Sequence, residues 1–163
     1  MTDASNTESV SARGGPGDDR TLTIERTFAA TPDRVFQAWT EPETLIQWWG
    51  PEGHHIPEYT MDVREGGAWR TVMESEKGER HIASGVFREI APPERLVMTW
   101  AWEQPDGRRG HETMIELTFQ PDPDGTRLRL VQRLFETVEG RDNHRKGWTS
   151  TLNCLDEMLS RPT

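Results

Sequence analysis

The side chains with the most scope for molecular recognition in this sequence are its tryptophans, of which there are seven. An indole ring offers a large apolar face and one N–H donor, so tryptophan suits the wall of a binding site as well as a core. Ordinary core packing explains any single tryptophan, but so many in one small chain favour the lining of an apolar cavity. Methionine suits adaptable pockets and extends the set. The predicted lining consists of Trp69, Met73, Met98, Trp100, Trp102 and Trp148, with Trp48 or Trp49 near the mouth.

Polar groups near these walls are fewer. Gln132 shares its strand face with Leu128 and Leu130, which predicts an inward amide that would orient a ligand by a hydrogen bond. The alternative is that Gln132 lies at the end of its strand and meets water. His144 precedes Trp148 by four residues, so both lie on one face of a helix, and His144 is expected at the rim of the cavity.

A catalytic site is harder to find than a binding site. Tyr59, Glu112 and His144 are the titratable candidates that could lie beside the apolar walls, and Tyr59 and His144 are also candidates for ligand contact. The sequence contains no nucleotide-binding loop, no convincing Ser-His-Asp set and no paired carboxylates at helical spacing. No catalytic residue is therefore assigned.

Metal and redox chemistry find little support. His54 and His55 are adjacent in a predicted loop, and adjacent histidines cannot easily bind one metal ion. No cysteine or third histidine lies at ligand spacing, so no metal and no cofactor are expected. Cys154 is the single cysteine and cannot form an internal disulfide; its place in a predicted helix favours a buried structural thiol.

The overall charge limits the partners. A net charge of −9 argues against a nucleic-acid surface and against docking on anionic lipid. The chain has no apolar run of about 18 residues that could span a membrane. Its N-terminus lacks the basic and then apolar layout of a signal peptide. We expect no nucleic-acid or membrane partner and a cytoplasmic location.

Residues 1–20 carry almost no large apolar side chains, which predicts a disordered tail before a single domain over residues 21–161. A strand is predicted over 21–28. Two short helices follow, the first begun by Thr31-Pro32-Asp33 and the second over 43–49. Six alternating strands separated by turn signals fill residues 56–133. The final segment, 139–160, is a predicted helix.

This order predicts an α+β fold in which a curved, seven-stranded antiparallel sheet wraps the long C-terminal helix. One apolar stripe of that helix, Trp148, Leu152, Leu155 and Leu159, matches the face of the sheet that must be covered. A helix about 10 Å wide cannot fill the whole concave side of a strongly curved sheet. The unfilled part is the predicted cavity.

Five motifs follow one another along the chain: Trp48-Trp49-Gly50-Pro51, Val63-Arg64-Glu65-Gly66-Gly67, the segment from Gly85 to Leu96, Gly125-Thr126-Arg127-Leu128, and Gly147-Trp148. In this order and spacing they resemble the family named for the activator of the 90-kilodalton heat-shock protein ATPase, a branch of the START-like, or SRPBCC, helix-grip superfamily. The resemblance covers about residues 21–159 and implies a hydrophobic ligand cavity between sheet and helix.

Three functions stay open on the sequence alone. The first is binding of a small hydrophobic molecule, aromatic or lipid-like, in the cavity. The second is a cyclase or hydrolase activity on the same scaffold, and the third is a chaperone-associated stress-response module. The chain is expected to act as a monomer or a homodimer.

Overall fold

The computed structural model describes residues 18–161. The predicted tail therefore lies mostly outside the described residues; its last three residues form a short 3-10 helix, η1. In chain order the elements are η1 (Asp18–Arg20), β1 (Leu22–Phe28), α1 (Pro32–Thr40), α2 (Pro42–Leu45), β2 (His54–Met61), β3 (Ala68–Ser75), β4 (Arg80–Ala91), β5 (Arg95–Trp102), β6 (Thr113–Asp122), β7 (Gly125–Arg133) and α3 (Val138–Leu159).

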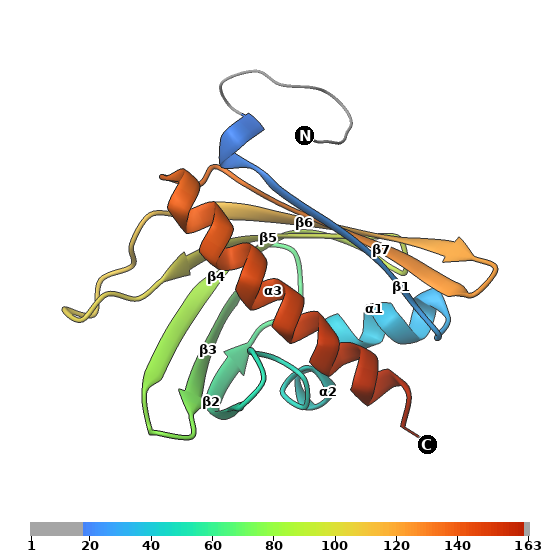
Figure 1. Cartoon of the computed structure of the whole chain (residues 1–163), viewed down its shortest axis with the longest axis horizontal. Coiled ribbons are helices and arrows are strands. Elements are labelled where there is room, and N and C mark those ends of the chain that lie inside the picture. The colour runs from blue at the N-terminus through green and yellow to red at the C-terminus, as the bar shows by residue number, and fades with distance from the viewer. Residues whose placement is uncertain (1–17, 162–163) are drawn as a thin grey trace.

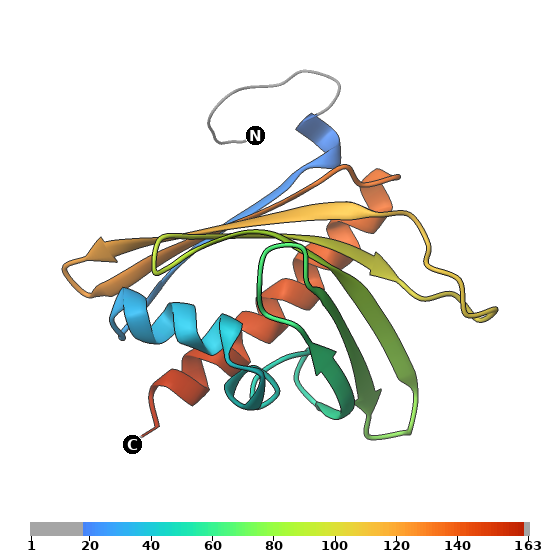
Figure 2. The same ribbon diagram turned by 180° about the vertical axis from the view of Figure 1, so that it is seen from behind.

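The seven strands form one sheet in the order β1-β7-β6-β5-β4-β3-β2, and every neighbouring pair is antiparallel. Figure 1 shows the long α3 running diagonally across the inner side of this curved sheet. Figure 2, from behind, shows α1 and α2 beside the lower half of α3. The predicted helix-grip α+β fold is confirmed.

Local chemistry explains where the helices begin. The hydroxyl of Thr31 accepts a hydrogen bond from the backbone N–H of Arg34, and Pro32 occupies the first turn of α1. The hydroxyl of Thr137 accepts from the N–H of Gly140 in the same way at the start of α3. The predicted apolar stripe of α3 is buried, and Thr151 and Met158 are buried with it.

Two local predictions are wrong. The second short helix ends at Leu45 and gives way to turns, and Trp48 and Trp49 of that turn segment are both buried in the core. His54 and His55 belong to β2 and not to a loop. They pair with Ser75 and Glu74 of β3, and the register of this pairing shifts between His55 and Glu58. The side chains of β2 therefore do not alternate regularly along the whole strand.

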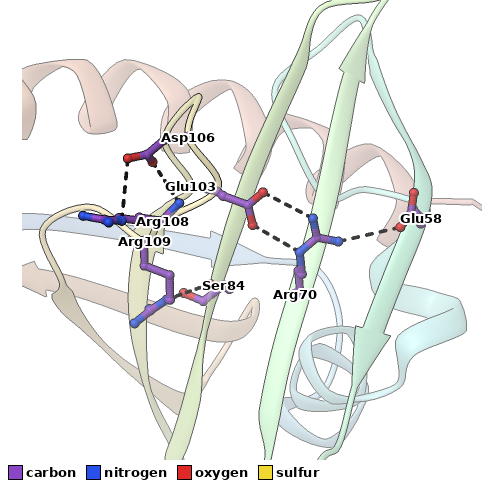
Figure 3. Close-up of polar contacts among 7 residues, drawn as sticks. All are labelled: Glu58, Arg70, Ser84, Glu103, Asp106, Arg108 and Arg109. Carbon is purple, nitrogen blue, oxygen red and sulfur yellow. Dashed lines mark hydrogen bonds and ion pairs between the residues drawn. The ribbon is translucent and has the colours of Figure 1, made fainter.

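The outer face of the sheet carries charged pairs. Figure 3 shows Arg70 of β3 between Glu58 of β2 and Glu103 after β5, with nitrogen–oxygen distances of 3.7 and 3.4 Å. Arg109, from the loop between β5 and β6, donates to the hydroxyl and carbonyl oxygens of Ser84 on β4, both at 2.8 Å. These contacts hold that loop against the outer face of the sheet.

Arginines on the outer face of the last strand pair with acids on the neighbouring strands. Arg133 pairs with Glu116 on β6, and Arg129 pairs with Glu25 on β1. Pairs this exposed contribute at most about 1 kcal/mol each to the free energy of unfolding.

Candidate functional site

A pocket of about 150 Å³ lies beside the first half of α3. The loop after α2 forms one side of it, and inner-face residues of β3 and β5 form another. The pocket opens to solvent, and nearly all of its surface is apolar. Its lining consists of Trp49, Gly50, Pro51, Met73, Trp100, Trp102, Asn143, His144, Gly147, Trp148 and Thr151.

Indole rings form the main wall of this pocket. Trp49, Trp100 and Trp148 contact one another in a triangle, with ring centroids 5.6 to 5.9 Å apart. Trp102 meets Trp100 edge to face at 5.2 Å and is the most exposed tryptophan, at 37%. Trp49, Trp100 and Trp148 come from the α2–β2 loop, β5 and α3, so this wall forms only when the sheet packs against the helix.

The remaining tryptophans extend the wall into the core. Trp39 contacts Trp48, Trp49 and Trp148, and Trp69 contacts Trp49 and Trp100. All seven tryptophans of the chain therefore belong to one continuous network of ring contacts.

A buried chain of hydrogen bonds fixes the ring of Trp148. Its Nε1–H donates to Oε1 of Gln132 at 2.7 Å, and Nε2 of Gln132 donates to the hydroxyl of Thr113 at 2.8 Å. That hydroxyl donates to the carbonyl oxygen of Trp100 at 3.2 Å. Gln132 has no exposed surface. The predicted inward amide is confirmed, although it contacts the back of the wall and does not line the pocket.

His144 and Trp102 are linked at the mouth. The indole Nε1–H of Trp102 donates to Nε2 of His144 at 3.0 Å, and Nδ1 of His144 lies 2.8 Å from the carbonyl oxygen of Gly140. An indole can only donate and a carbonyl can only accept, so the proton is on Nδ1 and the imidazole is neutral. Burial lowers the pKa of His144, and the hydrogen bond to Gly140 opposes this shift only in part.

The loop after α2 approaches the pocket closely at Gly50. Its φ is +93°, a backbone conformation that side chains disfavour, and a Cβ there would lie 3.2 Å from the sulfur of Met73. The N–H of Glu52 donates to the hydroxyl of Ser150 at 2.9 Å, which holds this loop to α3. At Gly50 itself, between the side chains of Trp49 and Pro51, the pocket is therefore bordered by backbone.

Comparison with known proteins supports the same architecture. Residues 29–160 match the family described as Activator of Hsp90 ATPase homolog 1-like protein. The chain belongs to this family. No curated protein matches the chain.

Solved structures share the fold of this chain. The AHSA1 protein from Silicibacter pomeroyi is 36% identical, with a TM-score of 0.79 over 86% of this chain and 97% of that one. A protein from Chromobacterium violaceum is 26% identical, with a TM-score of 0.78 over 88% and 99%. A solution structure from Arthrobacter aurescens, at 21% identity and TM-score 0.80 over 95% and 94%, shares the fold alone.

The predicted site residues of this family member fall into three groups. Trp49, Met73, Trp100, Trp102, His144 and Trp148 line the pocket. Trp69 and Met98 border a second space of about 10 Å³, which holds at most one water molecule. Trp48 donates its indole N–H to the carbonyl oxygen of Ala38 in the core, and Tyr59, on the edge strand β2, lies outside the lining.

Five lining residues were missed by the sequence analysis: Gly50, Pro51, Asn143, Gly147 and Thr151. Gly50-Pro51 and Gly147 belong to the family motifs, but a motif shared across a family does not say that a residue faces a pocket. Asn143 and Thr151 share the face of α3 that carries His144 and Trp148, and helical spacing could have found them.

The titratable candidates gain little support as catalysts. Both ring nitrogens of His144 are already engaged, and Glu112 is exposed and pairs with Arg109 at 2.9 Å. Within residues 18–161, no group of three or more His, Cys, Asp or Glu side chains could hold a metal ion. No helix in that same range is long and apolar enough to cross a membrane.

The neutral state of His144 predicts a dependence of stability on pH. Because its pKa in the fold is lowered from the ordinary 6.5, the unfolded chain binds a proton more readily than the folded one. The contribution of His144 is therefore complete above about pH 6.5 and is lost as the pH falls through the lower pKa of the folded state. Urea unfolding between pH 8 and 5 should show a steeper loss for the wild type than for His144→Phe. Parallel pH profiles for the two proteins would contradict the assignment.

Proposed function

We propose that this protein binds a small apolar molecule, about one aromatic ring in size, in the pocket beside α3. The observation that carries the proposal is Gly147. This glycine lies in the middle of a 22-residue helix, where glycine reduces helix stability by about 1 kcal/mol relative to alanine. Neither a left-handed φ nor a close neighbour requires it, since a Cβ at this position would meet nothing within 4 Å. The space that its missing side chain leaves is part of the pocket.

The size and chemistry of the pocket support an aromatic occupant. An engineered protein cavity of about 150 Å³ with apolar walls takes up benzene, and this pocket has a similar volume. Indole faces and the thioether of Met73 favour contact with another ring over contact with a charged group. A lipid chain or a fused polycyclic ligand would have to extend out through the mouth.

The alternatives have weaker support. A hydrolase or cyclase needs a free acid or base against the ligand, and His144, the titratable residue among those lining the pocket, has both nitrogens engaged. The family's name refers to activation of the Hsp90 ATPase, which would call for an exposed partner surface. Among residues 18–161, the large apolar side chains that are clearly exposed are Trp102, Leu134 and Val138.

A size series of ligands tests the proposal. Benzene, toluene, naphthalene and pyrene would be added to the isotopically labelled protein, and backbone and indole N–H signals would be followed by NMR. We expect saturable shifts for benzene and toluene, centred on Gly147, Trp148 and the indole N–H of Trp102, and no binding of pyrene inside the pocket. No saturable shift with any of the four compounds would refute the proposal.

A further inference from the structure

One side chain of the pocket is polar, buried and without a hydrogen-bond partner. Thr151 lies four residues after Gly147 on the pocket face of α3 and is only 4% exposed. Its neighbour on the same helix, Thr149, donates its hydroxyl to the carbonyl oxygen of Arg145 at 2.8 Å, which is the usual solution for a helical threonine. The hydroxyl of Thr151 makes no such bond, nor any other to the described residues.

The other buried polar side chains of the described chain are satisfied. Thr71, Thr99, Thr113, Thr126 and Gln132 each take part in a hydrogen bond. The hydroxyl oxygen of Thr151 is not among the fully enclosed atoms without a partner, so a water molecule or a ligand in the pocket can reach it. Polar groups in such positions ordinarily find a partner in the protein, in water or in a ligand. Thr151 stands apart from this set because it is the member that lines the pocket.

Three buried indole N–H groups among the described residues also lack hydrogen-bond partners, but they differ from the hydroxyl of Thr151 in being fully enclosed. The Nε1 atoms of Trp39, Trp69 and Trp100 are fully enclosed by the protein, so a molecule in the pocket could not reach them. Thr151 does not share that enclosure. A hydroxyl can donate to or accept from an oxygen atom, so this position can recognise a single polar group on an otherwise apolar ligand.

We infer that the ligand is a single aromatic ring that carries one hydrogen-bonding oxygen, as in a phenol, and that the hydroxyl of Thr151 recognises that oxygen. This inference rests on the proposed function of the pocket and adds the chemical class of its ligand. Thr151 is then a specificity-determining residue. It selects the oxygen-bearing ring over the hydrocarbon of the same shape, because only the former satisfies the hydroxyl.

The test compares two probes of nearly equal shape, phenol and toluene, on the wild type and on Thr151→Val. Valine has nearly the shape of threonine and replaces the hydroxyl with a methyl group. By calorimetric titration we expect phenol to bind Thr151→Val roughly three- to tenfold more weakly than the wild type, as loss of one hydrogen bond implies. Toluene should bind the variant at least as tightly as the wild type. Thr151→Ser, which keeps the hydroxyl, should restore the preference for phenol.

The outcomes separate this inference from the function on which it rests. If toluene binds but the phenol-to-toluene ratio is the same in the wild type and Thr151→Val, the pocket is a binding site and the role of Thr151 is refuted. If the substitution weakens both probes equally, Thr151 acts through packing, and the inference is again refuted. If neither probe binds the wild type, the proposed function itself fails.

Discussion

Gly147→Leu is expected to abolish binding of toluene while the protein keeps or gains stability. The isobutyl side chain would enter the open space over Gly147, which lies within the pocket, and would take the place of the ligand. Leucine is also a better helix former than glycine by about 0.8 kcal/mol, so the substitution favours α3. Loss of a function together with a gain in stability is what a residue kept for its empty space should show. Calorimetric titration and urea unfolding would measure the two effects.

Two further variants make this result specific. Lys146→Leu adds the same side chain at the neighbouring, exposed position of α3 and should leave toluene affinity unchanged. Gly147→Ala should raise the free energy of unfolding by about 1 kcal/mol and weaken binding less than leucine does. If Gly147→Leu binds toluene as tightly as the wild type, the ligand does not occupy this pocket.

Gln132→Ala is expected to lower the free energy of unfolding by about 3 kcal/mol. The substitution leaves the buried Nε1–H of Trp148 without an acceptor and opens a cavity between α3 and the sheet. For a protein of this size, such a loss corresponds to a fall in Tm of roughly 6–12 °C. The same change frees the ring of Trp148, so toluene affinity should fall as well. Urea and thermal unfolding would measure the loss of stability.

Two control variants test whether this loss of stability depends on the buried position of Gln132. Gln120→Ala removes the same side chain from an exposed site on β6 and should change stability by less than about 0.5 kcal/mol. Gln132→Met fills the volume without supplying an acceptor, so it should recover only the part of the loss that comes from the cavity. A cost below about 1 kcal/mol for Gln132→Ala would contradict the role of the network.

Strand periodicity was enough to predict the faces of the sheet. Trp100 and Trp102 lie on the inner side as their spacing requires, and the inward position of Gln132 follows from its neighbours Leu128 and Leu130. These predictions depend only on the alternation of side chains, which is a local property of the backbone.

Strand alternation could not predict whether a residue of the inner face lies in the closed core or in the pocket. Trp69 and Met98 share the inner face with Trp100 yet pack in the core, because α1 and α2 cover that part of the sheet and the first half of α3 leaves the other part open. Gly147 was missed for a related reason. A glycine has no side chain whose type could indicate a pocket, and the space beside it depends on which elements pack opposite it in the folded chain.

The continuous network of seven tryptophans has an optical consequence. Indole rings whose centroids lie 4.7 to 6.2 Å apart exchange electronic excitation far faster than they emit light. Light absorbed anywhere in the core should therefore migrate to the ring of lowest excited-state energy. Trp102 is the most solvent-exposed of the seven and donates a hydrogen bond to His144, which favours it as the emitter. The tryptophan fluorescence of the whole protein would then come mainly from Trp102 and would report on the mouth of the pocket.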